Sequence, residues 1–217
     1  LVAFLGFSGF FTWLYGSDIF LRNQADLQVF FSIGYWTLFF FIPAITMRTM
    51  AEEKKSGTIE LLLTKAVSDW QIIFGKFLAC LVLIFIALVF TFPYYLTVWK
   101  LGPVDHGSVL TGYLGLILMS AAYISIGIYT SSITNNQIVA FLLALLIGIF
   151  FHIIFDVLAS SFTGAMGAFF NYLSLSTHYE SISRGVIDSK DLVYFFSLIF
   201  LGLILSETTL SKRNLAE

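Results

Sequence analysis

Charged side chains are scarce in this sequence. Asp, Glu, Lys and Arg make up only 11% of the 217 residues, against about 25% in an ordinary soluble domain. Hydrophobic residues account for 59% and Phe alone occurs 25 times, so a soluble fold would lack the polar side chains that must cover its surface. The net charge of −2 and the lack of a dense basic run argue against nucleic acid as a partner. We therefore expect a protein embedded in lipid.

Cysteine and the common catalytic motifs are also nearly absent. Cys80 is the single cysteine, which excludes an internal disulfide and a cysteine-based metal cluster. Gly75-Lys76 has neither the upstream glycine nor the following Ser or Thr of a phosphate-binding loop. No His-Glu-x-x-His zinc pattern and no Gly-x-Ser-x-Gly elbow occurs. We expect a chain that is not an enzyme and binds no cofactor, although a membrane enzyme whose site is assembled from distant helices stays open as an alternative.

Long uncharged runs predict an all-α, polytopic membrane protein with six transmembrane helices. A span needs about 20 mostly apolar residues, and no alternating strand pattern is present for a barrel. We expect the first run to be the later part of a helix that begins before Leu1. The fourth and fifth helices share one uncharged stretch, divided by a polar turn at residues 130–136. The runs are 1–16, 29–47, 77–99, two within 107–151, and 192–210.

Basic residues predict the orientation, because Lys and Arg concentrate on the cytoplasmic side. The connection between spans two and three and the C-terminal tail fall on one side of a six-span protein, and they hold Arg48, Lys54, Lys55, Lys65, Lys76, Lys212 and Arg213. The opposite side has only Arg22, Lys100, Arg184 and Lys190. Both termini are therefore expected in the cytoplasm.

Two features within the spans are candidates for function. Pro43 and Pro93 remove backbone donors and should kink their helices, either to shape them or to act as hinges. His152 and Asp156 lie four residues apart on one helix face, at the outer end of span five. They could form a proton relay or cation site. Alternatively, both lie near the lipid headgroups and hydrogen-bond locally.

The connection between spans two and three carries the most informative motif. Its charged start is followed by Gly57, a helix breaker, and by Thr58, which can cap a short helix with Glu60 in the first turn. Leu61 and Leu62 make that helix strongly apolar. It is either an interfacial amphipathic turn or a docking element for a cytoplasmic partner. Ser68-Asp69 can then start another helix, which leads to Lys76 at the entry of span three and completes a short helical hairpin at the cytoplasmic surface.

Residues 52–64, Glu-Glu-Lys-Lys-Ser-Gly-Thr-Ile-Glu-Leu-Leu-Leu-Thr, resemble the signature of type-2 ABC exporter permeases, which have it between spans two and three. A second stretch, residues 173–194, is similar to the segment that such permeases carry before their last span. The likeness is greatest to the gliding-motility-associated permease subunit of the Bacteroidota. Two departures occur: Ala66 stands where many relatives have Pro, and the basic surface helix with which relatives begin is missing, which we attribute to truncation.

The resemblance implies one permease domain over residues 1–217, with a cytoplasmic coupling helix between spans two and three and short outer-side helices before span six. The residues that would couple to the ATPase are Glu52, Glu53, Gly57, Thr58, Glu60, Leu61 and Leu62. Re-entrant helices within residues 162–190 would cap the path on the outer side. The residues of that outer gate would be His178, Glu180, Arg184, Gly185 and Asp188.

The resemblance also implies partners and a location. The chain would sit in the bacterial inner membrane as one permease subunit of an ATP-driven exporter, serving gliding motility or secretion. A cytoplasmic ABC ATPase, which would bind ATP and magnesium, and a second permease subunit, identical or paralogous, would complete it. An ATPase-independent membrane enzyme and an ion-coupled transporter are the alternatives. The latter would show inverted repeats and charges at mid-membrane, and neither is found.

Overall fold

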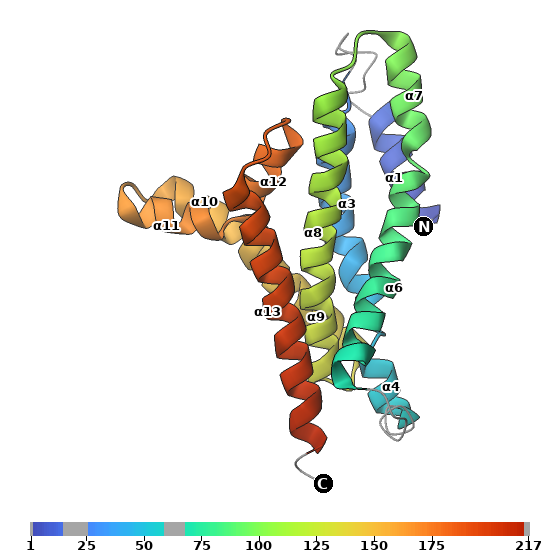
Figure 1. The fold of residues 1–217 in the computed structure, drawn as a ribbon, viewed down its shortest axis with the longest axis vertical. Helices are drawn as coiled ribbons and strands as arrows, with labels where there is room; N and C mark the ends of the chain where they lie inside the picture. The colour runs from blue at the N-terminus through green and yellow to red at the C-terminus, as the bar shows by residue number, and fades with distance from the viewer. Residues whose placement is uncertain (1, 15–25, 59–67, 215–217) are drawn as a thin grey trace.

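The computed structural model describes residues 2–14, 26–58 and 68–214, and every regular element in these ranges is a helix (Figure 1). Five stretches there are long and apolar enough to cross a membrane: Gln28–Ser56, Asp69–Leu101, His106–Ile133, Gln137–Ser161 and Ser189–Lys212. Helix α1 (Val2–Trp13) is apolar but only 12 residues long, short of the about 20 residues that a span needs. The sixth predicted span is therefore not confirmed.

The bundle has two distinct ends, which orient the rest of the description. The basal end holds α4, the turn between α8 and α9, and the last turns of α13, whereas the distal end holds the connection between α7 and α8 (Figure 1). The elements after α1 are α3 (Gln28–Thr46), α4 (Ala51–Ser56), α6 (Asp69–Val89), α7 (Phe92–Leu101), α8 (His106–Ile133), α9 (Gln137–Ile149), the π-helix η1 (Phe150–Ile154), α10 (Phe155–Ser161), α11 (Ala165–Leu173), α12 (Leu175–Ser183) and α13 (Ser189–Asn214).

Helix α8 is the central helix of the bundle. It contacts α3, α6, α9, α12 and α13, and most of its surface is buried by them. Ser120 and Ser125 on α8 donate to backbone carbonyls of their own helix at 2.6 and 2.7 Å, so their burial leaves no hydroxyl hydrogen unpaired. Close approach depends on Gly127, where a Cβ would clash with Thr46 at the end of α3.

The third predicted span is divided into two helices. Helix α6 begins at Asp69, well before the predicted start at residue 77, and ends at Val89. The chain turns at Phe90 and Thr91, and Pro93 lies in the first turn of α7, where its missing N–H costs nothing. The Thr91 hydroxyl lies 3.0 Å from the hydroxyl of Tyr113 on α8, which holds this break against the core.

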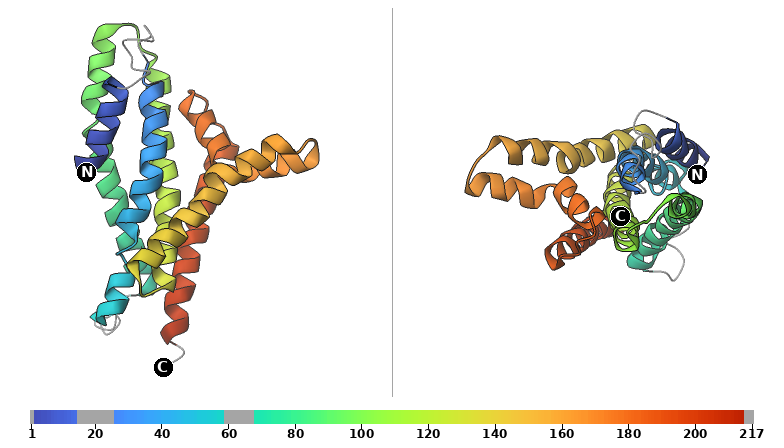
Figure 2. Two further views of the ribbon diagram at one scale, coloured as in Figure 1. Left: turned by 180° about the vertical axis from the view of Figure 1, so that it is seen from behind. Right: turned by 90° about the horizontal axis from the view of Figure 1, so that it is seen from above.

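The last part of the chain leaves the bundle and returns to it. The predicted turn between spans four and five is confirmed, since α8 ends at Ile133 and α9 begins at Gln137. Helices α9, η1 and α10 then run obliquely away from the bundle, and α10 and α11 form a hairpin that projects sideways (Figure 2). Helix α12 leads back to the distal half of α8 and α13. Helices α11 and α12 are short helices before the last span, as predicted within residues 162–190, whereas α10 belongs to the candidate span Gln137–Ser161.

Candidate functional site

Helix α4 starts the basal segment that was predicted to couple to an ATPase. Glu52 and Glu53 lie in its first turn and Lys54 and Lys55 in its last, an order that complements the helix dipole. Gly57 ends the helix with φ of +73°, in the left-handed region that favours glycine. The predicted breaker is thus confirmed.

The rest of the predicted coupling element is only partly described. The Thr58 hydroxyl lies 2.8 Å from the hydroxyl of Ser56, the last residue of α4, and both residues are exposed. Glu60, Leu61 and Leu62 lie outside the described residues. Their predicted role in docking therefore stays a prediction.

Lys76 of α6 holds α4 in place from one side. Its ammonium group lies 2.5 Å from a carboxylate oxygen of Glu53 and donates to the Thr49 carbonyl at 2.6 Å. The Glu53 side chain is only 29% exposed, so it points into the protein and braces α4 against α6. Glu52, by contrast, is exposed and lies 3.9 Å from Arg48. Of the two glutamates, Glu52 is the one available to a partner.

The basal ends of α8 and α9 hold α4 from the other side. The Ser131 hydroxyl bonds to backbone atoms of Met50 and Ala51 at the start of α4. The Lys54 ammonium group donates to the Ser132 carbonyl in the last turn of α8. Arg48 donates to the side chain of Gln137, the first residue of α9, at 3.2 Å. Helix α4 and the turn before it, which holds Arg48, are therefore attached to three helices of the bundle: α6, α8 and α9.

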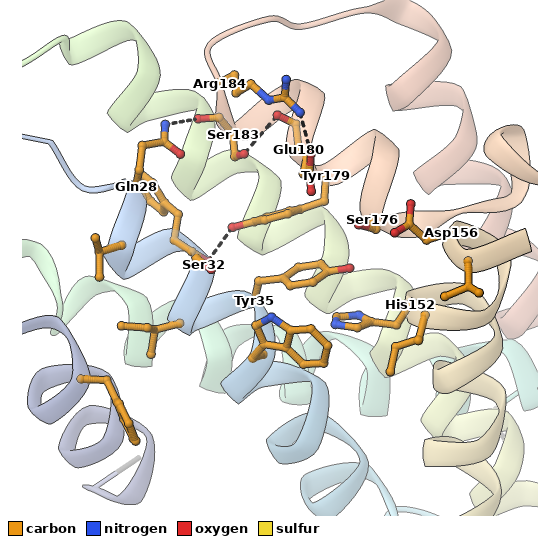
Figure 3. A pocket seen from close by; sticks show the side chains of 17 residues that line it. Gln28, Ser32, Tyr35, His152, Asp156, Ser176, Tyr179, Glu180, Ser183 and Arg184 are labelled. Carbon is orange, nitrogen blue, oxygen red and sulfur yellow. Dashed lines mark hydrogen bonds and ion pairs between the residues drawn. The ribbon is translucent and has the colours of Figure 1, made fainter. Parts of the chain in front are cut away.

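A cleft of about 720 Å³ opens in the distal half, between α3, α12 and the η1–α10 segment (Figure 3). Its wall mixes apolar side chains with polar ones from each of these elements. The Gln28 amide at the start of α3 donates to the Ser183 carbonyl at the end of α12, at 3.1 Å, and closes one side. The labelled polar and aromatic residues are Gln28, Ser32, Tyr35, His152, Asp156, Ser176, Tyr179, Glu180, Ser183 and Arg184.

Four aromatic rings form a stack at the inner side of the cleft, and three of them, Tyr35, His152 and Tyr179, line it. Tyr35 stacks on Tyr179 of α12 on one side and on His152 of η1 on the other, with ring centroids 4.6 and 3.9 Å apart. His152 also stacks on Phe39, at 4.5 Å. Burial raises the pKa of Tyr179 well above its usual value, so its hydroxyl keeps its proton and donates to the Phe31 carbonyl at 2.9 Å. The stack ties α12, α3 and η1 together.

His152 and Asp156 share the cleft but not an environment. The His152 side chain is buried, and its Nδ1 lies 2.8 Å from the Tyr123 hydroxyl of α8. Its Nε2 has no hydrogen-bond partner. Asp156 is exposed at the edge of the cleft. The expected local hydrogen bond is therefore wrong for His152, because its Nδ1 meets a residue of another helix and the π-turn places its ring between Tyr35 and Phe39.

The residues of the predicted outer gate fall into two groups. His178 is buried: its Nδ1 lies 2.7 Å from a carboxylate oxygen of Asp191 on α13, and its Nε2 lies 3.2 Å from the Tyr172 carbonyl. Its ring also stacks on Tyr194, at 4.0 Å. Because both ring nitrogens face acceptors, the contacts fit an imidazolium beside a carboxylate. His178 therefore joins α12 to α13 and does not line the cleft.

The other four lie at the distal surface. Glu180 and Arg184 form an exposed ion pair of 2.6 Å at the mouth of the cleft. Gly185 has φ of +100° and turns the chain after α12. Asp188 accepts from the backbone N–H of Lys190 at 3.2 Å and pairs with its ammonium group at 3.1 Å; these contacts lower the pKa of Asp188. Only Glu180 and Arg184 are brought to the cleft.

Sequence reasoning missed the aromatic ring stack beside the cleft, in which Tyr35 lines the cleft and Phe39 lies behind it in the core. Tyr35 and Phe39 are four residues apart on α3, which places them on one helix face. In an apolar span that spacing does not distinguish a cleft wall from a lipid-facing surface. In the described part of the chain, no three side chains of His, Cys, Asp or Glu gather as a metal site would require.

One protein-family model matches most of the chain. The model of the ABC-2 family transporter protein matches residues 14–209. No match is found among curated proteins. The match includes α3 to α12 and most of α13, and so both the basal segment and the distal cleft. The chain therefore belongs to the ABC-2 family of transporter proteins and is a multi-pass membrane permease component of an ABC transporter.

Proposed function

We propose that this chain is the permease subunit of a type-2 ABC exporter in a bacterial inner membrane, and that α4 with the residues after it receives the ATPase. The single observation that carries this proposal is the attachment of α4, and of Arg48 in the turn before it, to α6, α8 and α9. A surface turn would need no such attachment. A helix that transmits force from a partner must move together with the spans.

The distribution of basic residues supports a cytoplasmic basal end. Described residues at that end include Arg48, Lys54, Lys55, Lys76 and Lys212, and those at the distal end are Lys100, Arg184 and Lys190. The ATPase, with its bound ATP and magnesium, would dock on the basal end. The chain itself hydrolyses no ATP in this proposal.

The distal cleft is proposed as one part of the translocation path, completed by a second permease subunit, identical or paralogous. The described residues that line the cleft lie on α1, α3, η1–α10 and α12. The adjacent hairpin exposes apolar side chains such as Met166 and Phe169 (61% and 56%). Such surfaces suit a protein or lipid neighbour. The resemblance to gliding-motility permeases favours a role in gliding motility or in the related secretion.

Retention of an ATPase by the tagged chain tests the proposed docking. Leu61→Asp and Leu62→Asp should each reduce the co-purified ATPase strongly, because a carboxylate would enter an apolar contact unpaired. Val186→Asp is the matched control, since Val186 is exposed at the distal end. Membrane expression of all three should equal that of the wild type.

Two results would overturn the proposal. Wild-type yields of ATPase with both leucine variants would show that this segment does not dock the partner. A wild-type chain that retains no ATPase at all would favour the alternatives, an ATPase-independent membrane enzyme or an ion-coupled transporter.

A further inference from the structure

The junction between α3 and α4 is capped by a side chain from another helix. The Ser131 hydroxyl, in the last turn of α8, accepts from the backbone N–H groups of Met50 and Ala51 at 3.0 and 2.9 Å. It lies 3.0 Å from the Met47 carbonyl, to which it donates. Ser131, Met50 and Ala51 are fully buried, so water is excluded from these bonds.

These bonds use the whole capacity of the hydroxyl. A serine hydroxyl has one hydrogen to donate and two lone pairs to accept with. The first N–H groups of a helix have no partner within the helix, and Met50, in the capping position of α4, provides no side-chain acceptor. Ser131 takes over the function of an N-cap residue from outside the helix. Without it, two buried donors and one buried acceptor would be left unpaired.

A second attachment reaches the same turn of α8. The Lys54 ammonium group, near the end of α4, donates to the Ser132 carbonyl, one of the last carbonyls of α8, where the helix dipole favours a cation. Both ends of α4 are thus bonded to adjacent residues of one helix. The opposite side of α4, with Glu52, is exposed.

Helix α8 connects this attachment to the distal cleft. It runs the length of the bundle, from Ile133 at the basal end to His106 at the distal end (Figures 1 and 2). Near its distal end Gly115 lies against Tyr179 and Ile182 of α12, the former in the ring stack of the cleft. A displacement of α4 that is carried rigidly into α8 would therefore reach the wall of the cleft.

We propose that Ser131 is a positioning residue that couples α4 to α8, so that movement of the docked ATPase displaces α8 rather than bending the α3–α4 junction. This role rests on the proposed function of α4. It makes a specific demand: the hydroxyl at position 131 is required for coupling, whereas the hydroxyl of its neighbour is not. The Ser132 hydroxyl donates only within its own helix, to the Tyr129 carbonyl at 2.7 Å.

The test compares Ser131→Ala, Ser131→Thr and Ser132→Ala in the complex of the chain with its co-purified ATPase. Amide hydrogen exchange at residues 50 and 51 should be about tenfold faster in Ser131→Ala, since two buried bonds are lost. ATPase retention should stay at the wild-type yield, while the stimulation of ATP hydrolysis by the permease should fall several-fold. Ser131→Thr, which keeps the hydroxyl, should restore both readouts, and Ser132→Ala should match the wild type.

The outcomes separate this inference from the proposed function. Wild-type protection and stimulation in Ser131→Ala would overturn the inference and leave ATPase docking intact. Loss of ATPase retention in Ser131→Ala, or equal losses in Ser132→Ala, would also overturn it, because the effect would then be one of folding. If the wild-type chain retains no ATPase, the proposed function fails and the coupling role fails with it, whatever the exchange rates show.

Discussion

The buried pair of His178 and Asp191 allows a quantitative prediction about the distal half. Their side chains are 4% and 1% exposed, and the second Asp191 carboxylate oxygen has no hydrogen-bond partner. His178→Phe keeps a ring of similar size that can still stack on Tyr194. It removes the imidazole and leaves the Asp191 carboxylate buried without a charge partner. Breaking a buried pair from one side costs about 3–5 kcal/mol.

An exposed pair at the C-terminal end of α12 provides the control. Glu180 and Arg184 are separated by 2.6 Å, but their side chains are 57% and 68% exposed. Glu180→Gln should therefore lower the free energy of unfolding by about 0–1 kcal/mol. The double variant His178→Phe/Asp191→Leu removes both buried charges, and it should be less destabilised than His178→Phe alone.

Equilibrium unfolding in mixed micelles, followed by far-UV circular dichroism, measures these differences. The expected order of stability is wild type, Glu180→Gln, the double variant, then His178→Phe. The reasoning would be refuted if His178→Phe lost no more free energy of unfolding than Glu180→Gln. Burial of the His178–Asp191 pair would then make no difference to its contribution to stability. A double variant that loses more than His178→Phe would show that the pair stabilises the fold beyond the apolar packing that replaces it.

Three further predictions concern topology, the end of α4 and pH. Single cysteines are placed at positions 56, 106, 135 and 186, all exposed, in a Cys80→Ser background. A membrane-impermeant thiol reagent on intact cells should label the distal positions 106 and 186 and not the basal positions 56 and 135. Labelling of position 56 would show that the orientation is the opposite of the one proposed. Gly57→Val should reduce ATPase stimulation more than Gly57→Asn, because Asn tolerates the φ of +73° better than a β-branched residue; equal loss in both would contradict the backbone argument. The pKa of Asp188 is lowered in the folded state, so its contribution to stability is present above the unfolded pKa and is lost as the pH falls through the folded pKa. The difference in melting temperature between wild type and Asp188→Asn should therefore shrink on acidification. A difference that stays constant with pH would contradict this assignment.

Local signals in the sequence were enough to place several helix boundaries. Ser68 was predicted to start a helix, and its side chain forms a capping box with Gln71 at the start of α6. Gly57 was predicted to end one, and it does so in the left-handed conformation. The turn before α9 was predicted from its polar residues, and Asn136 caps that helix. Each of these features depends on a few neighbouring residues, so one sequence contains the information.

Boundaries that depend on tertiary contacts could not be predicted in the same way. The break between α6 and α7 was expected only as a kink at Pro93. It lies at Phe90 and Thr91 instead, where the Thr91 hydroxyl meets Tyr113 of α8. Hydropathy cannot detect such a break, because both sides of it are apolar. The kink expected at Pro43 is also not marked by a break, since α3 continues through that residue.

The candidate site also has some features that the local sequence predicts and others that depend on tertiary contacts. Glu180 and Arg184 were selected from a motif that resembles other permeases, and both line the cleft. His178 came from the same motif, but its partner Asp191 lies on the next helix, and only the packing of α12 on α13 buries them together. The site of His152 between Tyr35 and Phe39 likewise requires that η1 and α3 meet. Pairs of this kind depend on the fold rather than on spacing.

The π-helix η1 accommodates one extra residue between α9 and α10. The backbone N–H of Phe155 bonds to the Phe150 carbonyl, five residues back, so this turn contains one residue more than an α-helical turn. Because the extra residue is taken up within this one wide turn, the helix continues beyond it at nearly the phase of an uninterrupted α-helix. Its effect is local: His152 lies on the wide turn, and its ring reaches between Tyr35 and Phe39. The wide turn thus brings one buried ring into the wall of the cleft without changing the course of the helix that carries it.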